Sequence, residues 1–252
     1  MLRIRRPPRY VTNTSPLICS YGLPSNTTAD TKAWSIMRSA DGFPQFRFET
    51  RLGDAWSGDY PDNPAIRSEI APQAGNWLVY GVDHWVSFWQ RLTCPIDPTR
   101  TGVSAHLIPA QLHGGYPDRA PIFSQNVRED GFLEHRIIEQ TSAQAWGYST
   151  KFADAVGNDG NWHHYVMRLR PHANGDGTGS GQLQTWRDGV ELLNLTNLAF
   201  GYLGDPPPYW KYGMYIKPPT AAATNVVEVA SFIGPVSNSL VGLVSSPQAH
   251  RA

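Results

Sequence analysis

Residues 164–192, HYVMRLRPHANGDGTGSGQLQTWRDGVEL, form the stretch that decides the fold class. Two segments within it, 164–169 and 181–186, carry the apolar and aromatic residues of strands and flank a glycine-rich loop. The Asp-Gly pair at 188–189 predicts a tight turn before a further short strand at 190–192. Strand, loop, strand, turn and strand in this order are typical of an antiparallel sheet.

Segments of the same character recur along the chain and are separated by turn signals. Residues 46–52 alternate apolar and polar side chains, as a half-buried strand should. A single short helix is predicted, at 151–156. No repeat of about 20 to 50 residues recurs, so the sequence predicts one all-β sandwich of two antiparallel sheets. The other predicted strands are 77–82, 85–89, 105–113, 133–138, 209–216 and 226–233.

The composition bounds the domain organisation and the partners. The domain is expected to span 31–240, between an irregular lead-in at 1–30 and a tail at 241–252. The 252 residues include 21 Lys and Arg against 21 Asp and Glu, so no overall charge attracts nucleic acid or a membrane surface. No apolar stretch approaches the roughly 18 residues that cross a bilayer. Prolines interrupt the basic N-terminus, which therefore does not predict a secretory signal.

Two features bear on metals. Cys19 and Cys94 allow at most one disulfide, and neither belongs to a C-x-x-C pair, so a structural zinc site is not expected. The loop sequence Asn-Gly-Asp-Gly at 174–177 could hold a structural calcium ion, but it lacks the EF-hand pattern. A flexible hairpin tip is the favoured interpretation of this loop.

Two short motifs each place a pair of polar side chains on one face of a strand. In Arg67-Ser68-Glu69 the first and third residues share a face, so the arginine and the glutamate could form an ion pair. In Gln111-Leu112-His113 the glutamine and the histidine share a face while the leucine points to the core. Taken singly, a solvated ion pair and a structural histidine are the simpler interpretations of these two motifs.

A third motif, YWKYGMY at 209–215, is harder to explain as core. Tyr209, Lys211, Gly213 and Tyr215 fall on one face of the predicted strand. The glycine leaves a gap in this row, where a ligand could approach the backbone closely. Two phenols flanking an ammonium group favour a functional interpretation.

Together the three motifs supply the groups that elimination across a uronic acid requires. The carboxylate beside C5 must be neutralised, and the N–H donors of Arg67 and Gln111 match its geometry. A base must then take the C5 proton and an acid must protonate the departing O4, which His113 and a tyrosine activated by Lys211 can do. This chemistry requires neither a metal nor an organic cofactor.

The three motifs, in this order, resemble those of the jelly-roll polysaccharide lyases of the heparin lyase I, glucuronan lyase and alginate lyase group. The resemblance extends from about residue 34 to 235 and implies a concanavalin-like β-jelly-roll with a concave substrate groove. It implies that Tyr215 is the acid, and also the base if elimination is syn, and that His113 is the base or orients the substrate. The sequence that follows Tyr215, Ile216-Lys217, differs from the Asn-Gln of alginate-specific members, which argues against alginate. The site residues implied are His113, Tyr215, Arg67 and Gln111 for catalysis and Glu69, Tyr209 and Lys211 for substrate binding.

Other functions remain open at the level of the sequence. The segments at 162–164 and 186–189 resemble those of laminin-G or lectin-type carbohydrate-binding modules nearly as well, and such a module would bind without cleaving. A glycoside hydrolase needs paired carboxylates, whereas Glu49, Glu69 and Glu134 are scattered. The resemblance favours an extracellular or virion-associated protein that acts on an acidic polysaccharide. Nucleic acid and membrane partners are not expected; a monomer is expected, although the sequence leaves the oligomeric state open. Which uronic acid is cleaved, and whether cleavage is endo or exo, stays open.

Overall fold

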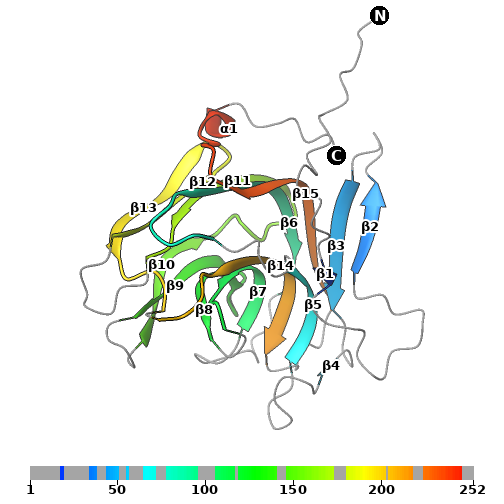
Figure 1. Cartoon of the computed structure of the whole chain (residues 1–252). Coiled ribbons are helices and arrows are strands. Elements are labelled where there is room, and N and C mark those ends of the chain that lie inside the picture. Colours follow the sequence, from blue (N-terminus) through cyan, green and yellow to red (C-terminus); the bar gives the residue numbers. More distant parts are fainter. Residues whose placement is uncertain are drawn as a thin grey trace, which may run out of the picture.

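The chain folds into two antiparallel sheets that pack face to face, so the predicted all-β jelly-roll sandwich is confirmed (Figure 1). One short helix, α1 (Gly242–Ser245), follows the last strand. Within the described part of the chain, no helix is long and apolar enough to span a membrane. The computed structural model describes residues 18–19, 34–38, 44–50, 55–56, 65–71, 78–95, 106–116, 119–140, 146–172, 180–202, 204–217 and 224–245.

The first sheet has eight strands, and β14 lies near its middle, between β5 and β7. β4 (Ala55–Trp56) pairs with β5 beside the main path. The order along the main path is β1 (Ile18–Cys19), β5 (Ala65–Ala71), β14 (Tyr209–Lys217), β7 (His106–His113), β8 (Pro121–Val127), β9 (Leu133–Gln140) and β10 (Trp146–Asp154).

The second sheet has seven strands, and it contains the segment that predicted the fold. β12 and β13 are joined by the tight turn at Asp188 and Gly189, whose φ angles of 51° and 83° are those that an Asp-Gly hairpin turn requires. The order is β13 (Val190–Leu198), β12 (Gly181–Arg187), β11 (Trp162–Arg170), β6 (His84–Thr93), β15 (Asn225–Val236), β3 (Pro44–Thr50) and β2 (Trp34–Arg38).

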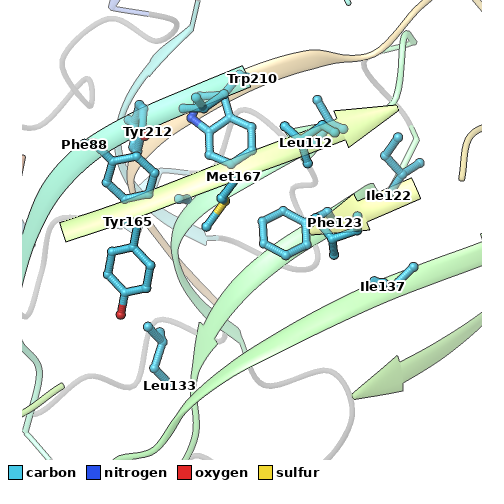
Figure 2. Close-up of a cluster of buried hydrophobic side chains, with 14 of the residues drawn as sticks. Phe88, Leu112, Ile122, Phe123, Leu133, Ile137, Tyr165, Met167, Trp210 and Tyr212 are labelled. Carbon is cyan, nitrogen blue, oxygen red and sulfur yellow. The ribbon is translucent and has the colours of Figure 1, made fainter. Parts of the chain in front are cut away.

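Apolar side chains from the two sheets meet in one core (Figure 2). On β6, alternate residues such as Val86 and Phe88 point inward, as the period of two of a strand dictates. The Phe88 ring lies 5.4 Å from that of Tyr165 in its own sheet and 4.9 Å from that of Tyr212 in the facing sheet. This aromatic contact fixes the position of β14 over β6.

Two predictions of local structure were wrong. Residues 151–154 extend β10 instead of starting a helix, because Phe152 packs inward opposite His135 and the strand pairing continues to Asp154. Residues 78–82 form a turn and not a strand. Their backbone donors are satisfied by loops, with Leu78 N donating to the Pro208 carbonyl oxygen at 2.8 Å.

His135 is a buried titratable group in this core. Its ring is fully enclosed and lies 5.9 Å from that of Phe123 and 6.3 Å from that of Tyr165. Neither ring nitrogen has a hydrogen-bond partner among the described residues. Burial accordingly lowers the pKa of His135 to about 4.

We expect the replacement His135→Phe to make the protein less sensitive to acid. In the unfolded chain a histidine binds a proton below about pH 6.5, whereas the folded protein keeps His135 neutral down to about pH 4. Protons therefore favour the unfolded state in this window, by about 3 kcal/mol at its lower end. Phenylalanine keeps the ring contacts and does not titrate.

Urea unfolding at pH 7 and at pH 4 measures the effect. The free energy of unfolding of the wild type should fall by about 3 kcal/mol more than that of His135→Phe. Burial also lowers the pKa of His164 to about 4, but this contribution is common to both proteins and cancels. Equal losses in the two proteins would show that His135 is not the acid-sensitive group.

Candidate active site

The three motifs lie on three adjacent strands. Arg67 and Glu69 belong to β5, Gln111 and His113 belong to β7, and the aromatic motif forms β14 between them. Segments about 40 and 140 residues apart in the sequence thus become neighbours, separated by single strand spacings of about 4.8 Å.

The strand pairing fixes which residues face one another. Across β14 and β7, Tyr209 lies opposite His113 and Lys211 lies opposite Gln111. Across β14 and β5, Gly213 lies opposite Glu69. The intervening residues Trp210, Tyr212, Met214 and Ile216 are in the core, so this row points to the other side of the sheet, which we call the outer face.

A buried hydrogen-bonded network occupies the middle of the outer face. The Lys211 ammonium group lies 2.9 Å from Oε2 of Glu69, and both side chains are 1% exposed. Gln111 donates from Nε2 to the other carboxylate oxygen of Glu69. A buried carboxylate with two donors is well compensated, and the network links β5, β14 and β7. Because Glu69 neutralises Lys211, the net field that the lysine exerts on the tyrosines is smaller than that of an unpaired cation.

His113 lies at the end of this network. Its Nδ1 is 2.8 Å from the carbonyl oxygen of Gly114. Since a carbonyl oxygen only accepts, Nδ1 carries a proton, and in the neutral form of the ring the lone pair is then on Nε2. The ring stacks on Tyr209 with centroids 5.1 Å apart. These contacts hold the histidine in the tautomer that a general base needs.

Tyr215 lies at the other end of the row, opposite Arg67 on β5 and Ile108 on β7. It is six residues along β14 from Tyr209, or about 20 Å, so the structure does not bring Tyr215 into contact with His113. Tyr215 is partly exposed. The Arg67 side chain lies outside the described residues, and so do its contacts.

A bulge separates the two halves of the row. The register of β14 against β7 shifts between Tyr212 and Tyr215, where Pro109 of β7 has no N–H for the ladder. Gly213 lies in this bulge with φ 129°, a conformation that favours glycine. The glycine of the motif is thus explained by the backbone as well as by the gap that it leaves for a ligand.

Four polar residues on β8 and β9 that the sequence did not indicate extend the outer face. Ser124 lies opposite Gln111 on one side and Arg136 on the other, and Asn126 lies opposite Glu134. Asn126 donates from Nδ2 to the Ser124 hydroxyl at 2.7 Å, and Arg136 pairs with Glu134. We call these four residues the β8–β9 patch.

The described residues contain no group of three or more His, Cys, Asp or Glu side chains that could hold a metal ion. The loop at 174–177, for which a hairpin tip is favoured over a calcium site, lies outside them. Glu49, Glu69 and Glu134, the scattered glutamates, form ion pairs with Arg47, Lys211 and Arg136, respectively. They therefore do not provide the neighbouring carboxylates of a hydrolase.

Comparison with known proteins gives a family and a fold. A family model described as polysaccharide lyase matches residues 27–230. No sequence among curated proteins gives a significant match.

Solved structures share the architecture at low sequence identity. An endo-β-1,4-glucuronan lyase from the fungus Trichoderma reesei is 16% identical, with a TM-score of 0.59 over 79% of this chain and 85% of that one. The binding domain of Paraclostridial Mosquitocidal Protein 1 is 11% identical, with a TM-score of 0.51 over 84% of this chain and 44% of that one. An alginate lyase from Corynebacterium sp. is 16% identical, with a TM-score of 0.49 over 82% and 81%.

Proposed function

The chain belongs to the polysaccharide lyase family, and from this premise we propose that it cleaves a uronic-acid-containing polysaccharide by β-elimination. As a member of this family it is an enzyme that acts on polysaccharides. Two further points are proposed here. The sugar beside the cleaved bond is a uronate, and named side chains take the proton from its C5 and protonate O4. A module that only binds carbohydrate is the less favoured function, because it has no need of a histidine held in a single tautomer.

The observation that carries the proposal is the row of polar groups on the outer face. Gln111, Lys211 and His113 are each at least nine-tenths buried, although their side chains are polar. Enclosed polar groups destabilise a fold unless they are paired, so their concentration on one face of one sheet points to chemistry. The overall charge of the chain is zero, and the recognition of an anionic polymer must therefore come from local groups.

The proposed reaction proceeds in a balanced sequence of steps. Arg67 and the second amide N–H of Gln111 neutralise the substrate carboxylate, which acidifies the proton on C5. His113 takes this proton on Nε2, the C4–O4 bond breaks, and a double bond forms between C4 and C5. Tyr209, whose ring stacks on that of His113, gives its proton to the departing O4. Tyr215, the donor that the resemblance implied, lies about 20 Å away along β14. One product chain has a new reducing end. The other has the unsaturated uronate at its non-reducing end.

The proton donor can be identified with two matched substitutions on the same strand. We expect Tyr209→Phe to lower kcat by a factor of about 10² to 10⁴, because a general acid contributes on this scale. Tyr215→Phe, the control, removes the hydroxyl at the other end of the row and should change kcat by less than about tenfold. The opposite ranking would move the acid to Tyr215, and near-normal turnover of both variants would exclude a tyrosine as donor.

The substrate can be identified from the absorbance of the unsaturated uronate. Glucuronan, heparin, hyaluronan and alginate are the polymers to compare. The Ile216-Lys217 sequence after the motif supports a glucuronate polymer over alginate. Binding of these polymers without any rise in absorbance would favour a carbohydrate-binding module and contradict the elimination.

A further inference from the structure

We propose that the β8–β9 patch is a second subsite, in which Arg136 binds the carboxylate of a neighbouring uronate in the same polymer. The inference rests on the proposed function for the class of its ligand. The patch itself follows from the strand pairing, since Ser124 lies between Gln111 and Arg136 in one continuous row. Gln111 and Arg136 are two strand spacings apart, about 10 Å. A polymer whose reacting uronate binds at Gln111 and that runs across the strands would therefore place another of its sugars at Arg136.

The patch is built from enclosed polar groups. Ser124, Asn126 and Glu134 are each no more than 5% exposed. The hydrogen bond from Asn126 to Ser124 fixes the amide, and the other end of this amide, Oδ1, has no hydrogen-bond partner among the described residues. A buried acceptor left in this way is destabilising, so the patch retains a polar atom beneath its surface that the fold does not compensate.

Arg136 supplies the hydrogen-bond donors of the subsite. Its side chain is 17% exposed, more than that of any other patch residue, so the guanidinium group can meet a ligand. Glu134 forms an ion pair with Arg136 and so restricts the orientation of the guanidinium group. A guanidinium group has five N–H donors, so it can bind Glu134 and still donate to a substrate carboxylate. Serine, asparagine and arginine at these positions therefore match a sugar that carries hydroxyls and one carboxylate.

The kinetic test compares three variants on β-1,4-glucuronan. We expect Arg136→Gln to raise KM by about ten- to a hundredfold, the range for loss of a hydrogen bond to a charged group. kcat should change by less than about threefold, because Arg136 does not touch the reacting atoms. Arg136→Lys keeps the charge and should recover part of the lost affinity. The control Arg128→Gln breaks a similar pair with Asp130 in the turn that follows β8 and should leave KM unchanged.

A binding experiment separates the subsite from the lyase proposal. In the Tyr209→Phe background, calorimetry with a glucuronan pentasaccharide should show the same ten- to hundredfold loss of affinity when Arg136→Gln is added. Cellopentaose, which lacks the carboxylates, should bind both proteins alike. If glucuronan binds equally well without Arg136, the subsite is refuted even though elimination stands. If binding depends on Arg136 but the wild type forms no unsaturated product, the subsite stands and the lyase proposal fails.

Discussion

His113→Ala should lower kcat/KM by a factor of about 10² to 10⁴ while the protein keeps its fold. The histidine is the base in the proposed reaction; its Nδ1 lies 2.8 Å from the Gly114 carbonyl oxygen, and Nε2 is the nitrogen that takes the C5 proton in this reaction. The side chain lies on the outer face, away from the core, so its removal should change the melting temperature little. Initial rates on glucuronan, with thermal unfolding measured in parallel, test both expectations.

His163→Ala is the matched control, since both histidines are 8% exposed. His163 belongs to β11 of the other sheet, where Asp159 and Asp188 hold its two ring nitrogens. Its replacement should leave the rate within about twofold, in line with a site remote from the chemistry. Free imidazole should restore part of the rate of His113→Ala, because it can occupy the space that the side chain leaves. Full activity of His113→Ala would remove this residue from the mechanism.

Lys211→Met should lower the free energy of unfolding by about 3 to 5 kcal/mol. The substitution leaves the Glu69 carboxylate, 1% exposed, without the cation that lies 2.9 Å from it. The cost of an uncompensated buried charge exceeds what the pair itself contributes, because the remaining ion can return to water only if the sheet opens. Chemical unfolding at neutral pH gives the magnitude.

The double variant Glu69→Gln with Lys211→Met distinguishes a buried charge from lost packing. It removes both charges and keeps an acceptor for the Gln111 amide, so more than half of the lost stability should return. Glu49→Gln, which breaks a more exposed pair with Arg47, should cost less than about 1 kcal/mol. Stability of Lys211→Met equal to that of the wild type would mean that the ion pair does not form in solution.

The sequence predicted the strands best where one face is apolar and the other polar. β11 and β14 were predicted from this pattern, and so was the turn at 188–189. β8 was missed because Gln125 is fully buried opposite His135, so polar residues lie on both faces and no period of two is visible. The helix expected at 151–156 was wrong because cross-strand pairing overrides a weak local preference.

The sequence predicted which side chains of each motif share a face, but it did not predict the contacts between the motifs. The spacing within each motif showed which side chains share a face, and the structure places the three motifs on neighbouring strands. The sequence suggested that Glu69 pairs with Arg67, whose side chain lies outside the described residues, and it did not predict the pair that Glu69 forms with Lys211. Register between strands depends on long-range pairing, which a single sequence does not reveal. The β8–β9 patch escaped notice for the same reason.

The network of Glu69, Lys211 and Gln111 has a consequence for how such an enzyme can evolve. Its two charges cancel within the protein, so it does not have to change when the charge pattern of the substrate changes. Residues on separate strands, such as Arg136, can then be exchanged one at a time while the reacting groups keep their places. If the proposed roles hold, the electroneutral network and the separate recognition residues would allow substrate preference to change without changes in the reacting groups.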